Sequence, residues 1–150
     1  MGTIVRAGIA RANARQRSRM KPIIFVVEDQ TELRESICEE LERTGFTTVG
    51  APHGEKALAE LRRVGPRPSL VLLDLLLPHK DGWEVVASMK ADSKLRDVPI
   101  VVMSAVPPQA TSLQAQGVAA TLSKPFTMEE LLFVILRFVQ PEKKRRSTRR

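Results

Sequence analysis

The chain has 150 residues, of which 43% are hydrophobic and 27% charged, and a formal net charge of +7. This length and composition fit a single globular domain with a buried core, and no apolar run approaches the roughly 18 residues that a membrane span needs. The first residues contain no continuous apolar segment of a secretory signal, and Arg6 stands where a myristoylation motif requires Ser or Thr. We therefore expect a cytoplasmic protein.

The positive charge is confined to the two ends of the chain. Residues 1–21 carry a net charge of +6, residues 141–150 carry +5, and the 119 residues between them carry −4. Because the ends lack apolar periodicity, we expect a disordered N-terminal extension (1–21), a folded domain (22–140) and a basic C-terminal tail (141–150). Such ends attract nucleic acid or another anionic surface non-specifically, although neither contains an aromatic residue for base stacking.

Strand and helix patterns alternate along the middle of the chain. Buried strands are predicted at 23–27, 46–50, 70–74, 98–103 and 119–122, and helices at 31–44, 54–64, 83–90, 111–116 and 127–138. Gly45 ends the first helix as a C-terminal cap, and Thr127 with Glu130 opens the last one as a capping box. This alternation predicts an α/β fold, with a parallel sheet covered by helices on both faces.

Polar side chains stand where four of the predicted strands end: Glu28, Asp29, Asp74, Ser104 and Lys124. Since crossovers between parallel strands are right-handed, these ends lie along one edge of the sheet, where α/β proteins form their sites. Asp74 closes an almost entirely apolar stretch, and on its own it could simply cap a turn. Five polar residues at matching strand ends instead indicate a functional site.

The chemistry of this set favours phosphoryl transfer. Three carboxylates repel one another, and a hard divalent cation with oxygen ligands, most naturally Mg²⁺, relieves the repulsion. The cation and Lys124 would neutralise the oxygens of a phosphoryl group, and Ser104 would donate a hydrogen bond to one of them. Asp74 is then the candidate nucleophile, forming an aspartyl phosphate.

The same residues resemble the receiver domain of two-component response regulators, over residues 22–140. The motifs are Glu28-Asp29, Asp74 with Pro78 and Asp81-Gly82, Ser104-Ala105, and Gly117 followed by Lys124-Pro125-Phe126. The resemblance implies a flavodoxin-like, doubly wound, five-stranded parallel sheet of order 2-1-3-4-5. It also implies that a histidine kinase or a phosphotransfer protein phosphorylates Asp74, and that a cis bond precedes Pro125.

The resemblance further implies a ligand set for Mg²⁺ and two sensors of the phosphoryl group. Asp29, Asp74 and the backbone carbonyl of Leu76 would hold the metal, with Glu28 acting through water. Ser104 and Lys124 would sense the phosphoryl group.

Two positions depart from the family pattern. Glu28 stands where the family more often has a second aspartate, and Thr121 stands where it usually has an aromatic switch residue. The chain has no tyrosine at all. We therefore expect activation to be transmitted by backbone shifts in the loop from Ser104 to Gly117 rather than by rotation of a large ring.

Only about ten residues follow the last predicted helix, so we expect a stand-alone receiver, a monomer or weak dimer, that binds an unknown downstream protein or relays phosphate and is not a turnover enzyme. The alternatives are an aspartyl-phosphate phosphatase, a degenerate receiver that acts as a constitutive binding module, and a regulator tethered to nucleic acid by its basic ends. A phosphatase of that kind needs an acid at the position of Leu76. Leu76 and Val106 should flank the path of a hydrolytic water, and because both are apolar we expect a long-lived phosphoryl group.

Overall fold

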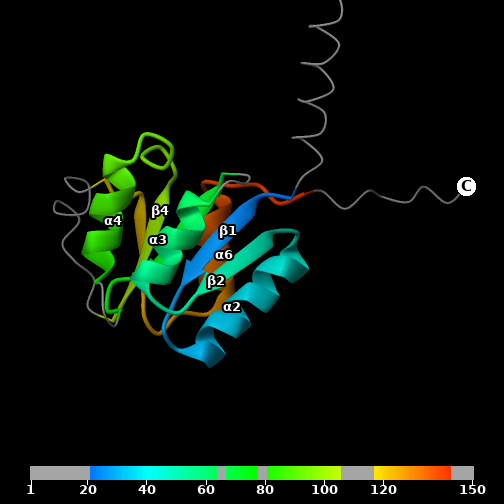
Figure 1. Cartoon of the computed structure of the whole chain (residues 1–150). Coiled ribbons are helices and arrows are strands. Elements are labelled where there is room, and N and C mark those ends of the chain that lie inside the picture. Colours follow the sequence, from blue (N-terminus) through cyan, green and yellow to red (C-terminus); the bar gives the residue numbers. More distant parts are fainter. Residues whose placement is uncertain (1–20, 64–66, 78–80, 106–116, 143–150) are drawn as a thin grey trace, which may run out of the picture.

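The computed structural model describes residues 21–63, 67–77, 81–105 and 117–142. Five parallel strands form one sheet with the order β2-β1-β3-β4-β5, which confirms the predicted fold class and topology (Figure 1). The strands are β1 (Ile23–Val27), β2 (Thr47–Ala51), β3 (Leu70–Asp74), β4 (Ile100–Ser104) and β5 (Ala120–Ser123). Every residue of β3 and β4 is buried, as expected for strands covered on both faces.

Four described helices cover the two faces of the sheet. They are α2 (Thr31–Thr44), α3 (Gly54–Arg62), α4 (Gly82–Ala91) and α6 (Met128–Leu136). Side chains alternate along β1: Phe25 and Val27 pack with α3 and α4, whereas Ile24 and Val26 pack with α2 and α6. The described part of the protein is therefore a three-layer sandwich of helices, sheet and helices.

Several element boundaries differ from the predicted ones for identifiable reasons. β2 begins at Thr47 because the Phe46 amide donates to the Leu41 carbonyl in the helix cap (3.0 Å). β4 begins at Ile100 because the Val98 amide is engaged in a turn with Leu95 (3.0 Å) and Pro99 has no N–H. The last helix ends at Leu136. The predicted helix at 111–116 and residue 64 lie outside the described residues.

The helix caps follow the chemistry that the sequence predicts at two of these ends. Gly45 adopts a left-handed conformation with φ of 116° after α2. The Thr127 side chain accepts a hydrogen bond from the Glu130 amide at the start of α6 (3.1 Å). The side chains of His53 and Asp81 likewise accept a hydrogen bond from a backbone amide in the first turn of α3 and α4, respectively. Gln30, which precedes α2, makes no such side-chain bond.

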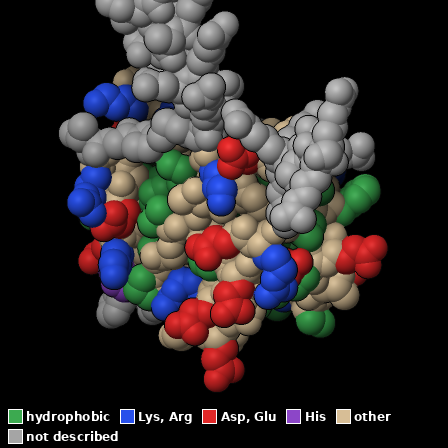
Figure 2. Space-filling view, turned by 90° about the vertical axis from the view of Figure 1, so that its right-hand side faces the viewer, with side chains coloured by type: hydrophobic (Ala, Val, Ile, Leu, Met, Phe, Trp, Pro, Cys, Tyr) green, Lys and Arg blue, Asp and Glu red, His purple; other side chains and the backbone are tan. Residues whose placement is uncertain are grey.

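Acidic side chains are concentrated on α2, and the surface reflects this. Figure 2 shows the side of the molecule that lies to the right in Figure 1, and Asp and Glu side chains stand close together at its lower end. The exposed acids of α2 are Glu32, Glu35, Glu39 and Glu42. No helix within the described ranges is long and apolar enough to cross a membrane.

Candidate functional site

The register of the sheet places the central acids side by side. Val27 of β1 pairs with Leu73 of β3, so the next residues along the two strands, Glu28 and Asp74, are neighbours at the carboxyl edge. Carboxylate oxygens of Glu28, Asp29 and Asp74 lie within 4.8 Å of one another. Glu28 and Asp74 are buried, whereas Asp29 is exposed and opens the cluster to solvent.

Lys124 bridges the two buried acids. Its Nζ lies 2.8 Å from Oδ2 of Asp74 and 3.0 Å from Oε2 of Glu28. The residue directly follows β5, its amide donates to the Ser104 carbonyl (2.8 Å), and a cis peptide bond joins it to Pro125, as expected. Residues 50 and 96 positions apart in the sequence are thus brought into direct contact.

The turn after β3 fixes Asp74. Oδ1 of Asp74 accepts a hydrogen bond from the Leu76 amide (2.9 Å), while Oδ2 faces Lys124. The Gly82 amide donates to the Leu75 carbonyl (2.9 Å), and a Cβ at position 82 would lie only 2.7 Å from the Asp74 carbonyl oxygen. Only glycine allows α4 to begin this close to the strand end. The Leu76 side chain, by contrast, is 75% exposed.

The electrostatics of the cluster favour a divalent cation. Burial, and next the hydrogen bond to Asp74, raise the pKa of Glu28 to about 7, although Lys124 opposes the shift. Burial alone would lower the pKa of Lys124, but its hydrogen bonds to Asp74 and Glu28 outweigh that effect and raise it. Lys124 is therefore charged at neutral pH. When all three carboxyl groups are ionised, this one ammonium leaves a formal charge of −2 for a divalent cation to neutralise. Carboxylate oxygens are the donors that Mg²⁺ prefers, so these residues fit that ion.

Ser104 completes the set of predicted residues at this edge. It ends β4, is buried, and pairs with Ser123 of β5. Thr121, at the position of the missing aromatic residue, is half-buried in β5. Val106 and most of the loop from Ser104 to Gly117 lie outside the described residues.

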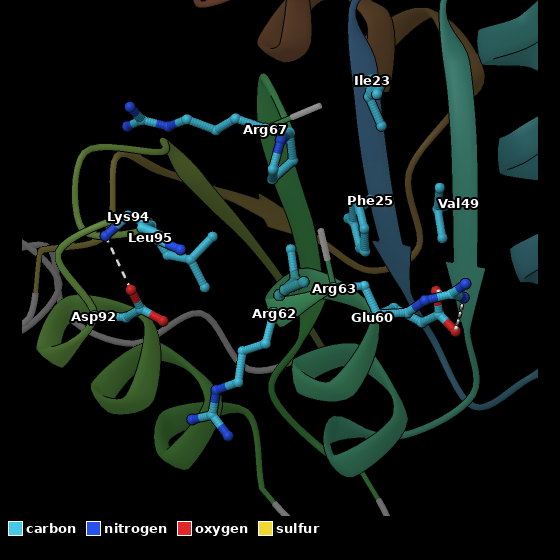
Figure 3. A pocket seen from close by; sticks show the side chains of 12 residues that line it. Ile23, Phe25, Val49, Glu60, Arg62, Arg63, Arg67, Asp92, Lys94 and Leu95 are labelled. Atoms are coloured by element: carbon cyan, nitrogen blue, oxygen red, sulfur yellow. Dashed lines mark hydrogen bonds and ion pairs between the residues drawn. The ribbon is translucent and has the colours of Figure 1, made fainter. Parts of the chain in front are cut away.

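A cavity of about 680 Å³ lies near the beginning of β1, away from the acid cluster (Figure 3). Ile23, Phe25 and Leu95 contribute to its apolar wall, and Arg62 and Arg67 flank it. None of the predicted site residues lines it. The cavity is therefore separate from the site at the carboxyl edge of the sheet.

These features define a receiver-type module, with a flavodoxin-like sheet and an acidic pocket joined to a lysine. The sequence model of the response regulator receiver domain matches residues 24–136. The chain belongs to that family, whose domains are phospho-accepting signalling modules of two-component systems rather than classical enzymes.

Curated relatives extend beyond the region they share with this chain. Over 111 residues it is 34% identical to the phosphate regulon transcriptional regulatory protein PhoB of Escherichia coli, covering 73% of this chain and 48% of PhoB. It is 30% identical over 113 residues to the DNA-binding dual master transcriptional regulator RpaA of Synechocystis, and the match covers 74% of this chain and 46% of RpaA. The chain thus spans about half the length of these relatives.

Solved structures agree with the fold and with the acidic site. The chemotaxis protein CheY4 of Vibrio cholerae superposes with a TM-score of 0.73 at 24% identity, covering 79% of this chain and 98% of CheY4. The receiver domain of the sensor histidine kinase PA1611 of Pseudomonas aeruginosa has a TM-score of 0.69 at 27% identity, covering 78% and 96%. That structure holds a magnesium ion in its active-site cleft, and the acidic cluster of this chain matches such a site.

One contact at the site was not anticipated from the sequence. Nη1 of Arg34, on α2, donates to the carbonyl of Glu28 in the turn that precedes the helix (2.7 Å). One signal for this contact was present in the sequence: Arg34 lies in the first turn of a predicted helix, where acidic side chains are normally favoured.

The raised pKa of Glu28 predicts how the metal-free protein responds to pH. Between the ordinary value of 4.5 and about 7, the folded protein holds a proton that the unfolded chain has lost. Its stability should therefore fall as pH rises through this window. Urea unfolding in EDTA between about pH 5 and about pH 8 measures the effect.

Glu28→Gln should remove the part of the pH dependence that arises at Glu28, whereas Glu55→Gln on the exposed start of α3 should leave it unchanged. An unaltered slope in Glu28→Gln would contradict the assignment.

Proposed function

We propose that the chain is a response regulator in which Asp74 takes a phosphoryl group from a histidine kinase or a phosphotransfer protein. The contact between Lys124 and both buried acids carries the proposal. It sets a charged ammonium beside the candidate nucleophile, next to an acid cluster of the kind that holds Mg²⁺. We place this reaction in the cytoplasm.

We expect some residues of the cluster to bind Mg²⁺ directly and one to bind it through water. Asp29 and Asp74 would bind it with the backbone carbonyl of Leu76, and Glu28 would act through water. When bound, the ion would offset the negative charge of the incoming phosphoryl group. Because the Leu76 amide already holds Oδ1 of Asp74, the same turn orients the nucleophile.

In the transfer step, the phosphorus–nitrogen bond of the donor histidine breaks as a bond forms between an Asp74 oxygen and phosphorus. The imidazole leaves and takes up a proton. Lys124 exchanges its contact with Glu28 for one with a phosphoryl oxygen, and the Ser104 hydroxyl donates to another.

The output of the phosphorylated domain would be a protein contact, or relay of the phosphate, through β5 and α6. Phe133 on α6 is 70% exposed and would lie within this contact surface. With Thr121 at the switch position, backbone movement after Ser104 would carry the signal. We expect a monomer or a weak dimer.

A second candidate function is a degenerate receiver that binds its partner constitutively. The departures at Glu28 and Thr121 favour it, while the contact between Asp74 and Lys124 speaks for a working acceptor. Tethering to nucleic acid through the basic ends is a further alternative, based on their charge alone.

Incubation with acetyl phosphate and Mg²⁺ tests the proposal. Intact-protein mass should increase by a single phosphoryl group in the wild type and not in Asp74→Asn, and EDTA should abolish the increase. Asp81→Asn, at the cap of α4, serves as a matched control and should still be phosphorylated.

An adduct that persists in Asp74→Asn would contradict the assignment of the acceptor. If the wild type gains no mass and beryllofluoride leaves Trp83 fluorescence unchanged, the constitutive binding module is the better description.

The apolar side chain of Leu76 predicts slow loss of the phosphoryl group. Leu76 has no group that could orient a hydrolytic water, so the phosphorylated protein should persist for minutes or longer after the donor is removed. Leu76→Asn should shorten this lifetime by about tenfold, less than the roughly 100-fold or more of a general base, because an amide can orient a water without taking its proton. Loss from the wild type within seconds would contradict the prediction.

A further inference from the structure

Arg34 links the two strand ends next to the acidic site. It lies in the first turns of α2, and its guanidinium reaches back to the Glu28 main-chain carbonyl at 2.7 Å. The Glu28 amide is in turn bonded to the Ala51 carbonyl at the end of β2 (3.1 Å). Both main-chain polar groups of Glu28 are thus fixed by neighbouring elements.

The stem of the Arg34 side chain runs across β2 at Gly50. A Cβ built at Gly50 would lie 3.2 Å from Cδ and 3.4 Å from Cγ of Arg34, closer than ordinary van der Waals contact. Gly50 therefore leaves space for the arginine to lie flat against the strand. Arg34 is half-buried here, although Gly50 itself is exposed.

Other described contacts at the turn between β1 and α2 leave Gln30 weakly held. The bonds to Ala51 and Lys124 hold Glu28, and the Arg34 amide makes the first helical bond to the Gln30 carbonyl (2.9 Å). Gln30, which precedes α2, caps the helix with no side-chain bond, whereas side chains of His53, Asp81 and Thr127 cap the other described helices. The Gln30 amide makes only a long hydrogen bond to Oε1 of Glu28 (3.4 Å). This turn also carries two carboxylates that repel each other and Asp74.

We infer that Arg34, lying flat on Gly50, is a positioning residue that holds the β1–α2 turn in the shape in which Glu28 and Asp29 serve a divalent cation. The inference rests on the proposed function for its metal. Its direct claim concerns the turn itself, which exists with or without the ion.

A purely electrostatic role predicts the opposite effect on the metal. A guanidinium on the Glu28 carbonyl repels a cation held by the neighbouring carboxylates, so its removal would then strengthen Mg²⁺ binding. If Arg34 positions the turn, its removal weakens binding, because residues that orient metal ligands typically contribute 10-fold to 100-fold in affinity.

Arg34→Met tests the inference, because it keeps most of the apolar stem and removes the guanidinium. In the metal-free full chain, amide exchange of Gln30 should accelerate, and calorimetric titration should show Mg²⁺ binding weakened by about tenfold. Arg43→Met is the matched control: the exposed Arg43 lies on the same helix and pairs with half-buried Glu40, so this variant should change neither the exchange rate nor the affinity. Compared with Arg34→Met, Arg34→Lys should restore part of the slow exchange at Gln30 and part of the Mg²⁺ affinity.

Gly50→Ala tests the same contact from the side of β2, because the added Cβ would displace the stem of Arg34. It should weaken Mg²⁺ binding in the wild type but not in Arg34→Ala, where no stem remains to be displaced. Urea unfolding of each variant separates this coupling from a general loss of stability.

The inference would be overturned if Arg34→Met bound Mg²⁺ within twofold of the wild-type affinity and left amide exchange at Gln30 unchanged. Tighter Mg²⁺ binding by Arg34→Met would also overturn it. If the wild type binds no Mg²⁺, the proposed function fails, and exchange at Gln30 still decides whether Arg34 holds the turn.

Discussion

The ion pair of Lys124 with Glu28 and Asp74 is the interaction on which the rest of the site depends. Two carboxylates are buried within reach of each other, a costly arrangement in a low-dielectric interior unless positive charge accompanies them. One ammonium cannot neutralise three acids, and the pKa of Glu28 remains raised. The site is therefore suited to a divalent cation, and under the proposed function a phosphoryl group would draw Lys124 away from Glu28.

The fold provides this arrangement through its strand order. Placing β1 and β3 side by side brings the acids together, and β4 next to β5 brings Ser104 and Lys124 to the same edge. Local contacts then set individual atoms: the Leu76 amide holds one oxygen of Asp74, and Gly82 lets α4 begin against the strand end. Non-local topology gathers the residues, and short-range hydrogen bonds orient them.

The sequence was sufficient for the architecture and for the residues at the strand ends, because both follow from the alternation of apolar runs with polar residues. The strand order came from the family resemblance carried by those residues. Boundaries were less predictable, since Phe46 joins a helix cap and Pro99 delays β4 through hydrogen bonds that no apolar pattern encodes.

The role of Arg34 was hard to predict for a similar reason, and its place in the first turn of α2 was the one sequence signal for it. Its role depends on a gap at Gly50 that exists only once β2 lies beside β1. On the sequence it is one charged residue among many on an amphipathic helix. The exposure of Leu76 inside a leucine-rich run is likewise a property of the turn that follows β3.

A crystal structure of the protein with Mg²⁺ and beryllofluoride tests the central claim most directly. The account predicts the metal on Asp29 and Asp74, the fluoride group on an Asp74 oxygen, and Lys124 moved from Glu28 to a fluorine. Lys124 still bridging Glu28 and Asp74, with metal and fluoride elsewhere or absent, would contradict it.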